Sequence, residues 1–311
     1  MARGRCGGSW VWMAAVLACE RPAADPAESH ALPATPAPTR ARVASIRVRF
    51  DNGRPEFGKA ESSEDRLRAV AVFADADPRD RSIVLGLVGG GDAAGADPGL
   101  DGCVRQGSVG GGAGAAASTR PASWIQLMDV GNLELRAGNL ALPLQIRLLP
   151  AVVDATRGVR YEAVVERGRG LLAAGTLRLS ATGGDGMAAF SAEVAVPRPV
   201  RISFVGDQPP ETGLVRHLPP GELRVRWGSV DGRADLELLA GSETTDVPVW
   251  LRCRPKDDGE FVLPAGMVAQ LPPRSPQRPW TLMVVRRSRA AVPGFGDGGL
   301  TLEVADAVHV E

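Results

Sequence analysis

Residues 133–149, LELRAGNLALPLQIRLL, indicate the fold class of the chain most directly. They hold two apolar runs, Leu133–Leu135 and Leu142–Leu149, separated by the turn-forming pair Gly138-Asn139. Short apolar runs divided by glycine and asparagine are typical of β-strands joined by turns. The stretch therefore predicts two consecutive strands.

The same pattern continues on both sides of this stretch. No window of the sequence sustains a helical apolar stripe for three turns, so the runs favour strands throughout. Regular spacing of short strands with Gly, Asn and Asp turns favours a sandwich or a barrel. We therefore predict an all-β fold. The further runs are Ala44–Phe50, Arg68–Phe73, Ser82–Val88, Trp124–Met128, Val159–Val165, Thr176–Ser180 and Phe190–Val196.

One run, Ala44–Phe50, alternates strictly. Ile46, Val48 and Phe50 fall on one face and arginines on the other, as expected of a half-buried strand. By contrast, residues 89–121 are mostly Gly, Ala and Asp with a single Cys103. They predict a long surface loop that contains no strand.

The segment Val196-Pro-Arg-Pro199 predicts a domain boundary, because two prolines in four residues remove two strand hydrogen-bond donors. We expect one β-rich domain at residues 44–197 and a second at 198–311. The second contains about seven apolar runs, the number found in an immunoglobulin-like sandwich. Residues Glu222–Trp227 resemble the second strand of fibronectin type III domains, where a tryptophan packs into the core. The resemblance implies that the second domain is immunoglobulin-like, and with the strand spacing of the first we expect two β-sandwich-like domains. Residues 254–259 predict a hairpin loop.

The N-terminus reads as an export signal. Arg3 and Arg5 precede an unbroken apolar run, residues 10–18, that is too short to span a bilayer. Residues Val16–Cys19 resemble the lipobox of bacterial lipoproteins, with Val16 where the family usually has leucine and Leu17 where it has a smaller residue. The resemblance implies removal of residues 1–18 and acylation of Cys19. A plain signal peptide cut at the same bond, without lipid, is the alternative.

Residues 19–43 predict a disordered tether, because they are rich in proline and alanine and hold almost no large apolar residue. Glu20 is not the aspartate that the lipoprotein family uses for retention in the inner membrane. We therefore expect a cell-envelope protein anchored to the outer membrane by lipid, or otherwise secreted.

Charge balance excludes one class of partner. The chain has 36 Lys and Arg against 36 Asp and Glu, and loss of Arg3 and Arg5 leaves a slightly negative protein. Only Lys59 and Lys256 are lysines. Such a balance gives no strong attraction to nucleic acid. The partners we expect are the membrane, through the lipid anchor, and an envelope protein or carbohydrate.

Two cysteines remain once Cys6 leaves with the signal and Cys19 is acylated. Cys103 and Cys253 are an even pair in an oxidising compartment, which predicts a disulfide between them. Period-two alternation places Cys253 on the face of Val249 and Leu251, with Trp250 and Arg252 opposite. Cys253 as a small buried apolar residue, without a disulfide, is the alternative.

Several short motifs have the spacing of nucleotide-binding or metal-binding sites but lack the neighbouring residues that such sites need. Gly53–Lys59 has phosphate-loop spacing, but Ala60 replaces the hydroxyl residue that would hold Mg²⁺. The glycine-rich segment 110–115 precedes no helix that could receive a pyrophosphate. The aspartates at 75–80 and 92–101 lack the glycine and closing glutamate of an EF-hand. We therefore predict no metal and no cofactor.

Catalytic residues are also not indicated. The three histidines, at 30, 217 and 309, form no metal pair, and there is no nucleophile elbow. We predict a non-enzymatic binding or structural module and name no catalytic residue. The alternative is a carbohydrate-active or other envelope hydrolase with acids from distant strands. Convergent acids and tryptophans in one cleft would favour that alternative. Four tryptophans in strand runs are expected to be core residues, with a surface aromatic platform for carbohydrate as the alternative: Trp124, Trp227, Trp250 and Trp280.

Overall fold

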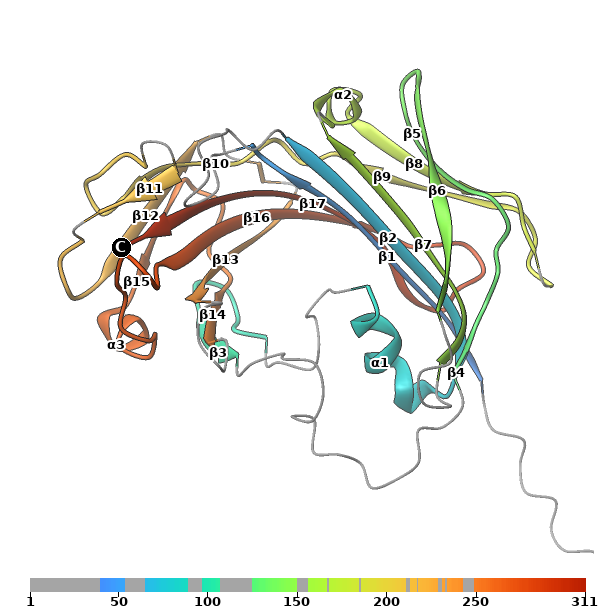
Figure 1. The fold of residues 1–311 in the computed structure, drawn as a ribbon, viewed down its shortest axis with the longest axis horizontal. Helices are drawn as coiled ribbons and strands as arrows, with labels where there is room; N and C mark the ends of the chain where they lie inside the picture. Colours follow the sequence, from blue (N-terminus) through green and yellow to red (C-terminus); the bar gives the residue numbers. More distant parts are fainter. Residues whose placement is uncertain are drawn as a thin grey trace, which may run out of the picture. The chain divides into compact units, whose positions relative to one another are not determined.

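The structure of the chain is a computed structural model, and it confirms the all-β prediction. Residues Pro38–Glu311 form one compact unit. Strands account for most of this unit, and its helices are short (Figure 1). The residues that the structure describes are 40–53, 65–88, 97–106, 125–149, 156–166, 168–184, 186–210, 213–216, 218–228, 231–232, 234–242 and 249–311.

The elements follow one another in a fixed order along the chain. The helices are η1 (Pro78–Asp80), α1 (Arg81–Gly86), α2 (Arg169–Leu172) and α3 (Ala265–Val268). The strands are β1 (Ala41–Asp51), β2 (Arg66–Ala76), β3 (Cys103–Gln106), β4 (Ile125–Leu127), β5 (Leu133–Ala137), β6 (Leu140–Leu149), β7 (Thr156–Glu166), β8 (Thr176–Ala181), β9 (Phe190–Ala195), β10 (Arg201–Val205), β11 (Leu214–Val215), β12 (Leu223–Gly228), β13 (Asp235–Ser242), β14 (Val249–Cys253), β15 (Glu260–Leu263), β16 (Trp280–Ala290) and β17 (Asp297–Val310).

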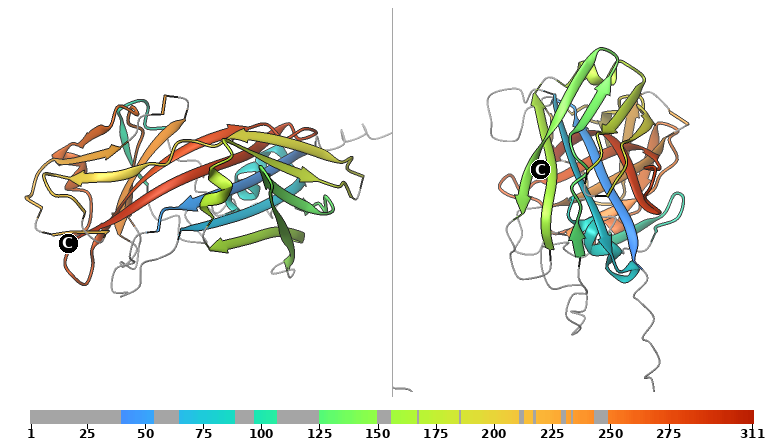
Figure 2. Two further views of the ribbon diagram at one scale, coloured as in Figure 1. Left: turned by 90° about the horizontal axis from the view of Figure 1, so that it is seen from above. Right: turned by 90° about the vertical axis from the view of Figure 1, so that its right-hand side faces the viewer.

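A large sheet runs through the unit. Its strands are ordered β3-β14-β13-β16-β17-β1-β2-β4-β7-β6-β5-β8-β9, and β11 pairs with β17 off this path. The first long strand, β1, lies parallel to the last, β17, with Arg49 opposite Glu303. The longest strand, β17, and its antiparallel neighbour β16 bend along their length (Figure 2). Segments from both ends of the sequence therefore meet at the centre of the sheet.

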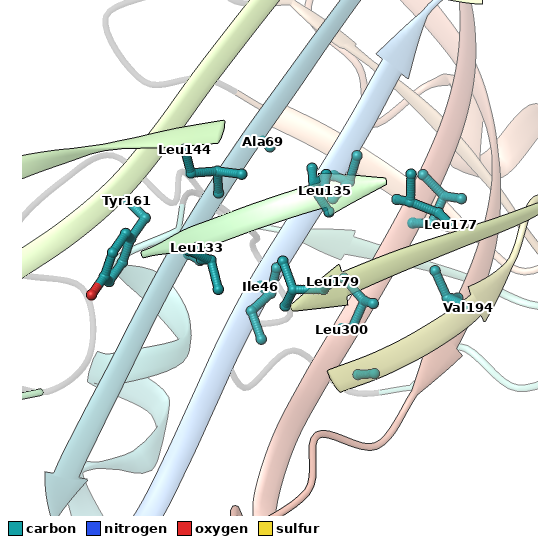
Figure 3. Close-up of a cluster of buried hydrophobic side chains, with 14 of the residues drawn as sticks. Ile46, Ala69, Leu133, Leu135, Leu144, Tyr161, Leu177, Leu179, Val194 and Leu300 are labelled. Carbon is teal, nitrogen blue, oxygen red and sulfur yellow. The ribbon is translucent and has the colours of Figure 1, made fainter. Parts of the chain in front are cut away.

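One face of β17 is covered by two separate layers. Leu300, Leu302 and Val304 belong to a first apolar core beneath β5, β8 and β9. Figure 3 shows Leu135 of β5 and Leu179 of β8 facing the strands that carry Ile46 and Leu300. Burial of this many leucine and valine side chains, each worth roughly 1.5–3 kcal/mol, is the main source of stability here.

The second core lies further along the same face of β17. Val308 and Val310 pack with residues of β13, β14 and β16 beneath a three-stranded sheet ordered β10-β12-β15. Trp227, on β12, is buried in this core, and the burial of β12 alternates along the strand as its sequence predicts. The immunoglobulin-like resemblance of this half stays a prediction.

The opposite face of the sheet carries helix α1. Val84 and Val88 lie one turn apart and pack on Val43, Val70 and Val72 of β1 and β2. The run Ser82–Val88 was expected to form a strand, and that expectation is wrong. Spacing of four residues between its buried valines suits a helix, and Asp77 caps the preceding turn by accepting from the Arg79 N–H.

Three further expectations need correction. Residues 103–106 form strand β3 and not loop, because β14 offers an open edge for pairing. Residues 254–259 do not close a hairpin, since β14 pairs with β13 while β15 pairs with β12 in the other sheet. Residues 41–43 lie in β1 and not in the tether.

The boundary expected near Pro197 coincides with the change from one core to the other. It does not separate two independent bodies, because β17 contributes to both cores and β1 pairs with it along nine positions. The division into domains 44–197 and 198–311 therefore does not hold in the structure. In the part of the chain that the structure describes, no helix has the length and apolar character needed to cross a membrane.

Candidate functional site

A cavity of about 920 Å³ lies on the face of the large sheet opposite the two cores. Its floor comes from β1, β17, β16, β13 and β14, with Arg81, Leu85 and Val88 of the α1 segment on one side and Gln106 of β3 on the other. Figure 1 shows α1 and β3 on the same side of the long strands. We call the sheet surface that carries Arg47, Glu303 and Arg287 the cavity face.

Strict alternation in the strands produces this face. On β1, Arg47 and Arg49 point to the side opposite Ile46 and Val48, which are buried in the first core. On β14, Trp250 and Arg252 line the cavity, while Cys253 is buried in the second core. The sequence prediction of which side chains lie on the same face of these two strands is therefore confirmed.

Five charged side chains of alternating sign cross the cavity face, and we call them the charge ladder. The Arg47 Nε donates to Glu303 Oε2 at 2.8 Å, and the Arg287 Nε donates to Glu303 Oε1 at 2.8 Å. Arg287 also donates to Glu237 Oε2 at 2.9 Å, and Glu237 accepts from Arg252. Each of the five comes from a different strand, in the order β1, β17, β16, β13, β14.

Glu303 is the centre of the ladder. Its side chain is only 2% exposed. Burial alone would raise the pKa of this carboxyl, but the guanidinium groups of Arg287 and Arg47 outweigh burial and hold the pKa below its usual value. Glu303 is therefore ionised at neutral pH.

Beside the ladder lies an apolar strip made of Ala307, Met283, Leu239 and Trp250. Ala307, Met283 and Leu239 are opposite one another on β17, β16 and β13. Trp250 on β14 lies diagonally from Leu239, because it is opposite Gly241, two residues further along β13. Met283 packs with Val285 and Ala305 in a small cluster separate from both main cores. The cavity face thus passes from a charged region to an apolar one.

Arg49 stands where these two regions meet. Its Nε donates to Asp51 Oδ1 at 2.7 Å, while its Nη2 is directed to the thioether sulfur of Met283 at 2.8 Å. Thioether sulfur is a weak acceptor for a guanidinium, which carries five N–H donors. Gln106 also has unused donor capacity, because its buried Nε2 has no hydrogen-bond partner among the described residues. Both donors line the cavity.

The lining of the cavity is strongly basic. Six arginines and two glutamates contribute to it, an excess of four positive charges. Arg289 and Arg81 are paired at the rim with Asp235 and Asp297, which are not themselves part of the lining. With these two aspartates and Asp51, the partner of Arg49, counted, the charged groups at the cavity keep one net positive charge, which suits an anion.

Cys103 and Cys253 are joined by a disulfide with a Cα–Cα distance of 4.0 Å, as the cysteine count predicted. They are directly opposite on the antiparallel strands β3 and β14, so the bond fixes the strand that brings Gln106 to the cavity. Cys253 is also fully buried, but the alternative of a buried cysteine without a disulfide does not hold.

The other residues singled out in the sequence do not form a site. Trp227 and Trp280 are core residues, and the ring of His309 lies beside Thr281 at 3.4 Å. Asp77 caps η1, and Asp75 faces Arg40. Among the described residues no group of three His, Cys, Asp or Glu side chains is placed to hold a metal ion. Cys19, Trp124, His30, His217, Lys59 and residues 110–115 lie outside the described residues.

Sequence reasoning missed the cavity. The pattern of arginines facing away from the apolar side of residues 44–50 was visible, as was the opposite facing of Trp250 and Arg252. Nothing local indicated that Arg47 would meet Glu303, because these residues are 256 positions apart.

Comparisons with known proteins add no functional inference. No protein-family model matches the chain, and no curated protein matches it. Among solved structures twelve chains match. One, titled the yeast delta-COP-I mu-homology domain, is 10% identical, and the match covers 88% of this chain and 98% of that one with a TM-score of 0.23. A TM-score this low carries no argument about fold or function.

Proposed function

We propose that the chain is an exported, lipid-anchored envelope protein that acts as a non-enzymatic binding module, with the cavity on the large sheet as its binding site. The N-terminal segment supports export and anchoring, because residues 1–19 combine a basic start, an apolar run and a cysteine. The cavity supports binding. Its volume of about 920 Å³ falls within the roughly 300–1,000 Å³ range of small-molecule sites.

The observation that carries the proposal is the charge ladder inside this cavity. Burying ion pairs costs desolvation energy, and well-packed apolar residues in their place are often neutral or stabilising. A gain in stability therefore does not by itself explain why Glu303, Arg287 and Glu237 are buried here. A recognition surface does need fixed charges, and the cross-strand ion pairs hold these side chains in place.

The hydrolase alternative has a specific observation in its favour, since two glutamates and Trp250 line one cavity. A glycosidase pair needs one carboxyl that stays protonated to act as a general acid. Here Glu303 and Glu237 are both ion-paired to Arg287, and the pKa of Glu303 is lowered. This favours binding over acid catalysis.

The anchor is tested by Cys19→Ser. We expect the wild-type chain in the membrane pellet after detergent-free lysis and the variant in the soluble fraction, because the acylated cysteine is the proposed anchor. Intact-mass measurement should show the lipid on the wild type alone. A variant that stays in the pellet, with no lipid mass on either protein, would contradict anchoring through Cys19.

The cavity is tested by native mass spectrometry of Cys19→Ser protein purified from the producing cells. We expect a bound small molecule on this protein and its loss on adding Ala307→Trp, since the indole would fill the apolar strip. Ala141→Trp is the matched control, because Ala141 is an exposed strand residue outside the cavity. Equal occupancy in all three proteins would place the binding elsewhere.

A further inference from the structure

We propose that the ligand of this cavity is a single-chain amphiphile with an anionic head group, carboxylate or phosphate, held by Arg49. The inference deepens the proposed function and rests on the cavity being a binding site. It starts from the unequal hydrogen bonding of the groups that line the cavity.

The ladder itself is internally paired. Glu303 and Glu237 each accept from two arginines, so their carboxylates need no ligand. The groups with unused capacity are donors, namely the Arg49 guanidinium on its sulfur contact and the buried Gln106 Nε2. A ligand that satisfies this site must therefore bring acceptors, and the excess of arginines over carboxylates at the cavity favours an anion.

Strand register decides where the anionic group would lie. Arg49 is opposite Glu303 on β17, yet its Nη2 reaches Met283 on β16, the strand beyond. The guanidinium thus lies over the edge of the apolar strip. An oxyanion that accepted from Arg49 Nη2 in place of the Met283 sulfur would bring the alkyl chain attached to it directly against Met283.

From that point the apolar strip offers a continuous path. Met283 is opposite Leu239 on β13, and Trp250 on β14 is the diagonal neighbour of Leu239, opposite Gly241. A cation beside an apolar strip matches an amphiphile, whose head needs charge and whose chain gains from leaving water. A free phosphate or acetate would leave this strip unused.

Calorimetric titration of the exported chain carrying Cys19→Ser tests the proposal. The probes are dodecanoate, dodecyl phosphate, dodecanol, acetate and inorganic phosphate, with the amphiphiles below their micelle concentrations. We expect dodecanoate or dodecyl phosphate to bind one per chain, at least tenfold more tightly than dodecanol, acetate or phosphate. The tighter of the two anionic amphiphiles identifies the head group.

The variant Arg49→Gln should weaken the anionic amphiphile at least tenfold and leave dodecanol unchanged. Arg66→Gln is the matched control, because Arg66 is an exposed strand arginine paired with Glu166 outside the cavity. Trp250→Ala should weaken the same probe independently, which keeps the proposal testable if Arg49→Gln does not fold.

The failures are distinguishable. If dodecanol binds as tightly as dodecanoate, or if Arg49→Gln has no effect, the anionic head at Arg49 is wrong and the cavity remains a binding site. If acetate or phosphate binds as tightly as dodecanoate, the proposal that the site recognises an alkyl chain is wrong. If no amphiphile binds while native mass spectrometry still shows a molecule lost on Ala307→Trp, the ligand class is wrong. Absence of that molecule as well would overturn the proposed function itself.

Discussion

Arg286 is the largest fully buried side chain of the described residues, and it is held by one carboxylate. Its Nε and Nη2 donate to the two oxygens of Asp257 at 2.8 Å each. Asp257 also accepts from the Trp227 indole and the Asp231 N–H at 2.9 Å. Arg286 further donates to the carbonyls of Arg198 and Pro199. This pair therefore fixes the 254–259 loop and the segment between the cores to β16.

Asp257→Asn should lower the free energy of unfolding by about 3–5 kcal/mol, because it removes the carboxylate charge to which the buried Arg286 guanidinium donates through Nε and Nη2. Urea unfolding followed by tryptophan fluorescence measures the change. Asp97→Asn is the control, since Asp97 is largely exposed in its pair with Arg254 and should change stability little. Equal effects of the two substitutions would show that the Arg286 pair is not buried in solution.

Glu303 makes stability depend on pH. Its pKa in the folded protein lies below the unfolded value of 4.5, because Arg287 and Arg47 outweigh the effect of burial. A lowered folded pKa gives stability that is fully present above about pH 4.5 and is lost as the pH falls through the folded pKa. Glu303→Gln should therefore be less stable than wild type at pH 7, and the difference should shrink below about pH 4.5.

Urea unfolding between pH 7 and pH 3 measures this difference. Glu193→Gln serves as the control, because Glu193 is an exposed carboxylate paired with Arg178 on the surface. A gap between wild type and Glu303→Gln that stays constant or widens on acidification would contradict the ionised ladder.

At the scale of the element, β3 shows how a four-residue strand is kept in the sheet. Among the strands that the structure describes, it pairs with β14 alone and stands at one end of the sheet order. So short an edge strand has few hydrogen bonds with which to resist fraying. The disulfide to Cys253 joins it covalently to a buried position, and through Gln106 this strand also completes the cavity wall.

Replacing both cysteines, Cys103→Ser with Cys253→Ser, should lower the free energy of unfolding by about 4–5 kcal/mol. The bond closes a separation of 150 residues, and the chain-entropy model gives a loss of this size for so long a loop. Urea unfolding of the oxidised wild type and the double variant, both carrying Cys19→Ser, measures it. A loss below about 1 kcal/mol would mean that the bond constrains the unfolded chain little.

At the scale of the whole molecule, the two cores share their longest strands. Leu300 and Leu302 of β17 pack in the first core and Val308 and Val310 in the second. β17 is also hydrogen-bonded to β1, which comes from the other end of the unit. Two cores on one continuous sheet should unfold together.

The fragment 198–311 should therefore lack cooperative unfolding, although its own sequence indicates an independent domain. Without β1 and β5–β9 the leucines of β17 face water, and without β3 the disulfide partner of Cys253 is missing. Urea unfolding and near-ultraviolet circular dichroism of the fragment, beside residues 38–311 as the control, measure this. A sharp transition in the fragment would restore the two-domain division.

Local patterns in the sequence determined the strands, because period-two alternation and Gly-Asn turns act over a few residues. They gave the all-β class, the inward face of Cys253 and the outward face of Arg47, Arg49 and Trp250. The same patterns wrongly predicted a strand at Ser82–Val88, because β-branched residues favour strands. Here Val84 and Val88, one helical turn apart, pack on the face of the sheet, and this long-range contact favours a helix.

The cavity was decided only by the tertiary structure. Five strands from sequence positions 47, 303, 287, 237 and 252 had to become neighbours in one register before their charges could form a ladder. Strand order and register depend on contacts between distant segments, which alternation along one strand cannot specify. The sequence therefore predicts which side chains point away from the cores. The tertiary structure alone determines which residue each of them contacts.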